Sequence, residues 1–225
     1  MLFLIASPAY AKYGGGTGEP NDPYLIFDAN QMNAIGADSD DWDKCFRLMA
    51  DVDLGGFTYT TAVIAPDTYE YGDFDGTAFT GVFDGNNHKI INLTIDDGGA
   101  RNDYLGLFGY IGDGEVRNLG IEGGSVSGDR YVGGLVGGNR GSISNCYSTG
   151  YVSGYNRVGV LVGENSGSIS NCYSSSSVSG SSNVGGLVGW NDHGSVSNCY
   201  STGDVSGHWG VSGLVGFNSG SISNC

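Results

Sequence analysis

Short apolar stretches alternate with Gly, Ser and Asn throughout the second half of the chain. One segment, GGNRGSISNCYSTGYVSG from residue 137, recurs as GENSGSISNCYSSSSVSG from residue 163 and as GWNDHGSVSNCYSTGDVSG from residue 189. A shortened copy, GFNSGSISNC, begins at residue 216. The apolar stretches are brief, contain many β-branched residues and are bounded by turn-forming residues, which is typical of strands. The pattern predicts three or four short strands in each repeat.

The repeat has a nearly constant length. Its cysteines are 26, 27 and 26 residues apart, and the extra residue falls in the turn NDHG; they are Cys146, Cys172, Cys199 and Cys225. A fixed period with strand-like sequence is typical of a solenoid whose coils stack on one another. Equivalent strands would then lie parallel, about 4.8 Å apart. We therefore predict an all-β fold, a right-handed parallel β-helix with coils of about 26 residues.

Alternation along the strands predicts which side chains face the core. Ile143, Cys146 and Ser148 should point inward and Tyr147 outward, with Asn145 at a bend. We expect equivalent asparagines to stack in one column and to hydrogen-bond through their amides; the column is Asn92, Asn118, Asn145, Asn171, Asn198 and Asn224. We expect the stacked cysteines to be free buried thiols. Disulfides between coils are the alternative, but parallel side chains keep the Cβ atoms too far apart for an easy bond.

The chain divides into four parts by pattern. Residues 1–11, MLFLIASPAYA, resemble the end of a secretory signal peptide cleaved after Ala11. Residues 12–60 are predicted to form a linker, a cap and the first strand; the cap contains a short helix that begins after Asp28, with Gln31 placed for a capping interaction. Residues 61–132 should form irregular coils and residues 133–225 regular ones. Because the sequence stops within a repeat, we expect a truncated solenoid and further domains of the same polypeptide.

Composition and charge narrow the possible functions. The chain has 42 Gly but only 4 Pro, and the Gly has no three-residue period, which excludes collagen. Its net charge of −15 and lack of a basic stripe argue against nucleic-acid binding. After residues 1–11 no stretch approaches the ~20 apolar residues of a membrane span. We therefore expect a secreted or cell-surface protein.

The repeats resemble a known family. The segments GGLVGGN, GVLVGEN, GGLVGWN and SGLVGFN, each followed by a version of GSISNC, resemble the GLUG motif. The resemblance covers residues 133–225 closely. It implies an exported, modular, right-handed β-helix like those of bacterial adhesin-like surface proteins and of the region beside the protease domain of IgA-specific metallopeptidases. It implies no catalytic residues.

The sequence contains no complete catalytic motif. His88, His193 and His208 lack the H-E-x-x-H context of a zinc protease, so no metal ligand is assigned. Parallel β-helices include polysaccharide-degrading enzymes, and glycoside hydrolysis needs two carboxylates over one groove. Asp96 and Asp97 are adjacent, but we interpret them as a solvated bend. The basic side chains available to a lyase do not cluster with acids in the sequence; they are Arg101, Arg117 and Arg130.

Two further features could bind a ligand. Closely spaced acids suit calcium, although neither stretch completes a known calcium loop and a plain acidic loop is the preferred interpretation; they are Asp38, Asp40, Asp41, Asp43, Asp73 and Asp75. Three outward tyrosines, Tyr147, Tyr173 and Tyr200, should form an exposed column that could stack on sugars. The preferred alternative is that these rings pack on one another and fix the register. A second outward column should contain Gly138, Glu164, Trp190 and Phe217.

The sequence thus favours a structural stalk, or an adhesion module that meets glycans or surface proteins, within a larger bacterial protein. Two alternatives remain. The first is a polysaccharide-degrading lyase or glycoside hydrolase with a groove in the irregular coils of residues 60–132, where departures from the repeat allow a site. The second is a non-catalytic carbohydrate-binding module that uses the three tyrosines. We assign no enzymatic activity and no cofactor from the sequence.

Overall fold

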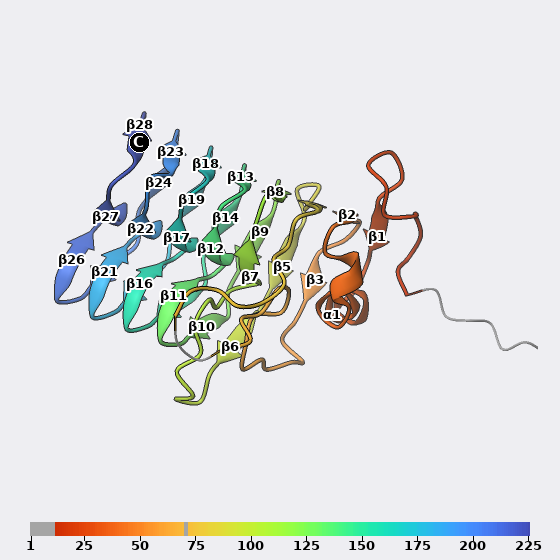
Figure 1. Cartoon of the computed structure of the whole chain (residues 1–225), viewed down its shortest axis with the longest axis horizontal. Helices are drawn as coiled ribbons and strands as arrows, with labels where there is room; N and C mark the ends of the chain where they lie inside the picture. The colour runs from red at the N-terminus through yellow and green to blue at the C-terminus, as the bar shows by residue number, and fades with distance from the viewer. Residues whose placement is uncertain (1–11, 70–71) are drawn as a thin grey trace, which may run out of the picture.

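The computed structural model describes residues 12–69 and 72–225 and shows a stack of coils that runs along the long axis of the molecule (Figure 1). The described residues form parallel β-sheets, one α-helix, α1 (Ala29–Gly36), and a 3-10 helix (Ser39–Asp41). The predicted parallel β-helix with a short N-terminal helix is therefore confirmed. The predicted signal peptide, residues 1–11, lies outside the described residues.

In each regular coil, three consecutive strands belong to sheets 1, 2 and 3 in turn. Sheet 1 contains β1 (Tyr24–Ile26), β2 (Cys45–Leu48), β4 (Val82–Asp84), β8 (Glu115–Arg117), β13 (Ser142–Ser144), β18 (Ser168–Ser170), β23 (Ser195–Ser197) and β28 (Ser221–Ser223). Sheet 2 contains β3 (Val52–Asp53), β5 (Lys89–Ile91), β9 (Gly120–Glu122), β14 (Tyr147–Ser148), β19 (Tyr173–Ser174) and β24 (Tyr200–Ser201). Sheet 3 contains β6 (Thr94–Asp96), β10 (Ser125–Ser127), β15 (Tyr151–Ser153), β20 (Val178–Ser179) and β25 (Val205–Ser206).

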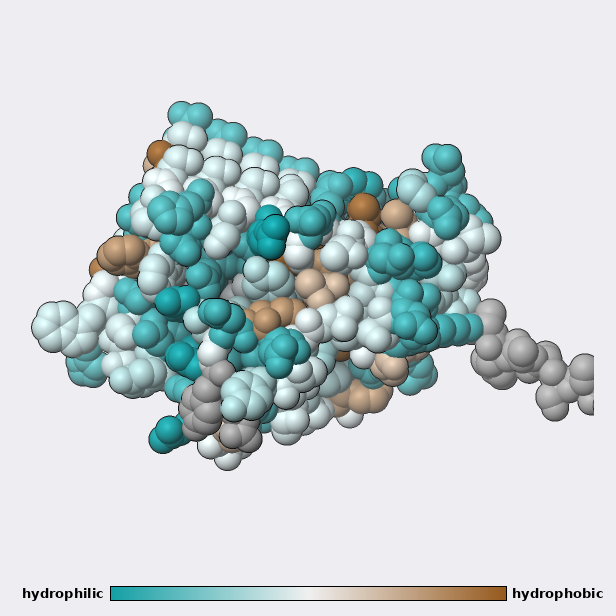
Figure 2. All heavy atoms as spheres, viewed as in Figure 1, coloured by the Kyte–Doolittle hydropathy of each residue, from teal (hydrophilic) through white to brown (hydrophobic). Residues whose placement is uncertain are grey.

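Two further sheets complete the coil. Sheet 4 contains β11 (Arg130–Gly133), β16 (Asn156–Gly159), β21 (Ser182–Gly185) and β26 (Trp209–Ser212). Sheet 5 contains β7 (Phe108–Ile111), β12 (Val136–Asn139), β17 (Val162–Asn165), β22 (Val188–Asn191) and β27 (Val215–Asn218). Figure 1 shows the equivalent strands of successive coils lying side by side, and Figure 2 shows the same repetition as rows of similar surface atoms.

Each regular coil contains five strands, so the predicted three or four was wrong. In the coil from residue 130 these strands are β11 to β15, and the strand that the sequence did not reveal is β11. Tyr131 in β11 has a left-handed backbone, with φ of 56°. This residue interrupts the alternation of inward and outward side chains, which is the signal by which a strand is recognised from sequence.

The predicted side-chain directions hold in the regular coils. Ile143, Cys146 and Ser148 are almost completely buried, whereas Tyr147 is only partly buried. Residues that pair across neighbouring strands are frequently identical, as Ile143 is with Ile169 in sheet 1. All five cysteines are free. Of the four stacked cysteines that we expected to be buried, Cys146, Cys172 and Cys199 lie in the core, whereas Cys225 is exposed. One continuous apolar core therefore runs through the stack.

The predicted asparagine column is wrong at its first member. Ile90 pairs with Ile121 rather than with Val116, and Val116 pairs with Phe83. Asn92 therefore follows a strand of sheet 2, whereas Asn118 follows a strand of sheet 1. The cause is a longer coil, which extends by 33 residues from Phe83 to Val116 instead of about 26. A constant period cannot locate this irregularity.

The asparagine side chains also bond differently from the expectation. At the bends that follow sheet 1, the pair Asn145 Nδ2 to Asn118 Oδ1 is bonded at 3.2 Å. The continuous amide ladder lies instead inside the coil, at the ends of the sheet 5 strands. Each amide nitrogen in it donates to the amide oxygen of the next coil at 2.7–2.8 Å; the members are Asn139, Asn165, Asn191 and Asn218.

The N-terminal segment covers the first coil. Asp28 caps α1 by accepting from the Gln31 N–H at 2.9 Å, and the Gln31 side chain accepts from the Phe27 N–H at 2.7 Å. Met32 and Ile35 of α1 are fully buried and join the core of the solenoid. Strand β1 pairs with β2 and extends sheet 1. The cap is therefore continuous with the β-helix rather than a separate domain.

Candidate functional site

The three predicted tyrosines lie in one column on sheet 2. Tyr147 pairs with Tyr173, and Tyr173 pairs with Tyr200. Their rings stack almost parallel, with centroids 4.9 and 5.2 Å apart. The Tyr147 hydroxyl donates to Glu122 at 2.7 Å. Because the facing ring surfaces contact one another, the column offers a ligand chiefly ring edges, and this arrangement favours a role in fixing the register.

The acidic residues are dispersed over local turns and ion pairs. Asp96 and Asp97 accept backbone N–H groups of Gly98 and Gly99 at 3.0 and 2.9 Å, as expected for a solvated bend. Asp38 contacts the Lys12 ammonium at 2.6 Å, and Asp41 contacts the same group. Within residues 12–69 and 72–225, no three His, Cys, Asp or Glu side chains are grouped as metal ligands. Calcium binding at these acids stays an untested alternative to the plain acidic loop.

The arginines named from the sequence do not form one cationic cluster. Arg117 pairs with Glu115 at 2.9 Å and with Asp84 at 3.4 Å on sheet 1. Arg130 pairs at 2.7 Å with Asp103, whose side chain is completely buried. Arg101 lies in a surface depression beside Arg130. The arrangement therefore does not place Asp96 and Asp97 beneath a shared set of basic groups.

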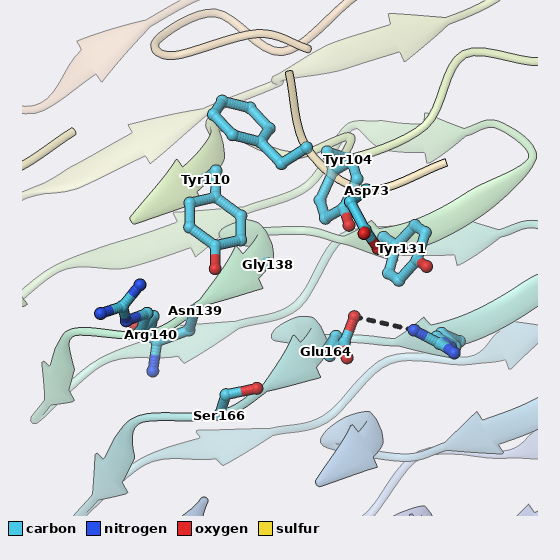
Figure 3. A pocket seen from close by; sticks show the side chains of 11 residues that line it. Asp73, Tyr104, Tyr110, Tyr131, Gly138, Asn139, Arg140, Glu164 and Ser166 are labelled. Carbon is cyan, nitrogen blue, oxygen red and sulfur yellow. Dashed lines mark hydrogen bonds and ion pairs between the residues drawn. The ribbon is translucent and has the colours of Figure 1, made fainter. Parts of the chain in front are cut away.

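A cavity of about 360 Å³ lies where the irregular coils meet the regular ones (Figure 3). Its lining residues come from sheets 4 and 5, from the turns that follow sheet 5, and from the segments that carry Asp73, Phe74 and Tyr104. Its lining combines aromatic rings with acidic, basic and neutral polar groups: Asp73, Phe74, Tyr104, Tyr110, Tyr131, Gly138, Asn139, Arg140, Arg157, Glu164 and Ser166. We define this group as the sheet 4/5 cavity.

One wall of the sheet 4/5 cavity is a continuous stack. The rings of Tyr104 and Tyr131 are parallel, with centroids 4.1 Å apart. The Arg157 guanidinium lies 4.6 Å from the Tyr131 centroid and 3.7 Å from that of Trp190, which places the cation between two aromatic faces. Phe74 stacks on Tyr110 at 4.6 Å, and both rings contact Tyr104 edge-on, at 5.5 and 5.8 Å. The stacks hold the lining side chains in fixed positions.

Glu164 lies at the floor of the cavity and pairs with Arg157 at 3.0 Å (Figure 3). Burial raises the pKa of Glu164, and the Arg157 guanidinium opposes this rise by stabilising the carboxylate. A partly desolvated carboxylate beside a guanidinium can accept and orient hydroxyl groups of a ligand. Among the described residues Glu164 forms no pair with a second carboxylate. Its geometry therefore supports no hydrolytic step.

Comparison with known proteins identifies the repeats. The family model described as the GLUG motif matches residues 128–153, 154–179 and 180–206. The chain contains three GLUG repeats. Their boundaries fall between sheets 3 and 4, so each repeat supplies one strand to each of the five sheets in turn. The resemblance noted from the sequence is therefore confirmed.

Two known proteins are similar to the GLUG-repeat chain. Halomucin of Haloquadratum walsbyi is 35% identical over 145 residues; the match covers 60% of this chain but only 2% of halomucin. A crystal structure described as a "putative immunoglobulin A1 protease" from Bacteroides ovatus superposes with a TM-score of 0.72 at 27% identity. That superposition covers 94% of this chain and 67% of the other. None of the described helices is long and apolar enough to span a bilayer.

The GLUG repeats provide seven of the eleven residues that line the sheet 4/5 cavity. The first repeat supplies Tyr131 and Arg140, and the second supplies Arg157 and Glu164, whereas Tyr104 precedes the repeats. Sequence reasoning placed a possible groove at residues 60–132 and named Glu164 in an outward column, but it did not identify the tyrosines and arginines of the cavity. The available signal was departure from the repeat: Tyr131 and Arg157 stand where later repeats have Asn183 and Gly210.

Proposed function

We propose that this chain is a rigid structural segment of a larger exported or surface-displayed protein. The observation that carries the proposal is unbroken register: in sheet 1 each regular strand pairs with its equivalents in the coils before and after it. A stack of this kind holds neighbouring parts of a polypeptide at a fixed separation. The match to about 2% of the length of halomucin supports a role as one segment of a long chain.

Rigidity can be measured by single-molecule energy transfer between two dyes. Cys225 is an exposed free thiol. A second thiol can be introduced by Gly56→Cys, because a Cβ at Gly56 meets no atom within 4 Å. Cys45→Ala removes the partly exposed competitor. We expect one narrow distance distribution that is insensitive to salt, because the repeats carry few charges.

A broad distribution that shifts with salt would contradict a rigid segment and would indicate a flexible connector.

Export is tested by a separate measurement. The proposal expects the mature chain to begin at Lys12, and mass spectrometry of protein recovered outside the cell checks this. A chain that remains inside the cell with residues 1–11 attached would contradict export.

A further inference from the structure

The backbone beneath the sheet 4/5 cavity adopts an unusual conformation. Tyr104, Tyr131 and Arg157 occupy equivalent positions in successive coils, and their φ angles are 54°, 56° and 58°. Large side chains seldom adopt this left-handed region. In the next two coils the position is taken by Asn183 and Gly210, which tolerate it better. Strained residues therefore accompany the cavity, as they do at many binding sites.

The outward column of sheet 5 opens at the same place. Tyr110, Gly138 and Glu164 follow one another in this column. A Cβ on Gly138 would lie 2.7 Å from Tyr110 Cδ2 and 3.0 Å from Tyr104 Cδ1. Glycine therefore lets both rings lean over the strand at a position where any larger residue would displace them.

Several polar side chains line the cavity, and most of them are not bonded to one another. Figure 3 draws one interaction among the lining side chains, the Arg157–Glu164 ion pair. Asn139 is only 2% exposed, lines the cavity and stands at the first position of the amide ladder. Its Oδ1 has no hydrogen-bond partner among the described residues. This oxygen is the first acceptor of a ladder that points into the coil, next to Ile111, so it belongs to the core and does not face the cavity.

The chemistry of the lining indicates the class of ligand. Acidic side chains (Asp73 and Glu164) and basic ones (Arg140 and Arg157) are both present, so the cavity favours neither a simple anion nor a simple cation. The lining of the cavity contains hydroxyl, amide, carboxylate and guanidinium groups as well as aromatic rings. A sugar has the complementary surface, since its hydroxyls both donate and accept while its C–H groups contact rings. The volume of 360 Å³ lies at the small end of the usual ~300–1,000 Å³ for ligand sites.

We propose that the sheet 4/5 cavity binds one or two saccharide units of a glycan. The partly exposed rings of Phe74 and Tyr110 pack against the sugar ring, Glu164 and Asp73 accept from its hydroxyls, and Arg140 donates to them. This would add adhesion to the structural role, and it locates the contact on a different face from the tyrosine column of sheet 2.

The test uses saturation-transfer NMR on the full chain with a panel of methyl glycosides: hexoses, N-acetylhexosamines and hexuronates. Inorganic phosphate serves as the anion probe. Tyr110→Ala removes a ring and Arg140→Ala removes an exposed donor, and each should weaken saccharide binding about tenfold or more. Tyr173→Ala is the matched control, because it removes a stacked tyrosine from sheet 2 and should leave binding unchanged.

Binding of a panel member that shows this pattern supports the proposal. Failure of every glycoside to bind overturns it, as does binding of phosphate alone. Binding that Tyr173→Ala abolishes and the cavity variants retain also overturns it and assigns the sugar to sheet 2. If Tyr110→Ala does not fold, as judged by circular dichroism, the Arg140→Ala result decides. The dye-distance measurement does not involve the cavity, so either proposal can fail without the other.

Discussion

At the scale of single residues, Asn145 and Cys146 show how a coil turns its corner. Asn145 has φ of 53°, and asparagine tolerates this conformation better than most residues. The next N–H, that of Cys146, donates to the sulfur of Cys172 in the following coil at 3.4 Å, and Cys172 bonds to Cys199 in the same way. Cysteine thus fills the core and also satisfies a buried N–H, a role that spacing alone could not reveal.

Asp103 gives a prediction for the dependence of stability on pH. Burial raises its pKa to about 6, although Arg130 donates to it and opposes the rise. Because the folded pKa exceeds the ordinary value of about 3.9, the folded state binds this proton more tightly. The resulting stability is fully present below about pH 4 and is lost as the pH rises through 6.

The measurement compares wild type with Asp103→Asn by urea unfolding at pH 7.5 and 5. The variant loses the charge attraction at both pH values but cannot titrate. Between pH 7.5 and 5 wild type should therefore gain about 1 kcal/mol relative to the variant. A difference that stays constant, or that changes in the opposite direction, would show that burial does not control this carboxyl.

At the scale of elements, the strands of sheets 1, 2, 3 and 5 could be predicted because their side chains alternate regularly. The strands of sheet 4 could not, since left-handed residues such as Tyr131 and Arg157 break the alternation. The amide ladder was assigned to the wrong asparagines for a related reason. Asn139 and Asn145 belong to the same repeat, and only the three-dimensional path shows that Asn139 points into the coil while Asn145 is exposed.

The ladder predicts different costs for two similar substitutions. Asn165 is fully buried, and its Nδ2 donates to Asn191 Oδ1 at 2.7 Å. Asn165→Asp places an acceptor against that oxygen and buries a carboxyl group, so it should cost about 3 kcal/mol of unfolding free energy. Asn218 is exposed and accepts from Asn191, and an aspartate can do the same.

Asn218→Asp is therefore the matched control and should cost less than about 1 kcal/mol. Urea unfolding of both variants at neutral pH measures the two costs. Equal costs for the two substitutions would mean that the buried amide ladder does not stabilise the stack in the way its geometry indicates.

At the scale of the whole molecule, the period of the cysteines was sufficient to predict a stack of parallel coils. The same period predicted the wrong register upstream, where the coil from Phe83 to Val116 is longer. It also could not predict the cavity that this irregular region forms with the first two repeats. Regular sequence specifies the shared architecture. The cavity depends on side chains that differ between coils, namely Tyr104, Tyr131 and Arg157, and their convergence requires the three-dimensional structure.

The central claim is that each GLUG repeat adds one coil to a rigid stack. Residues 154–179 form a complete repeat, and one, two or three extra copies can be inserted after Ser179. Small-angle X-ray scattering then measures the maximum dimension of each chain. We predict linear growth of about 4.8 Å per copy, the spacing of adjacent strands. Growth by several times that amount per 26-residue copy, or no regular growth at all, would contradict the stacked coil.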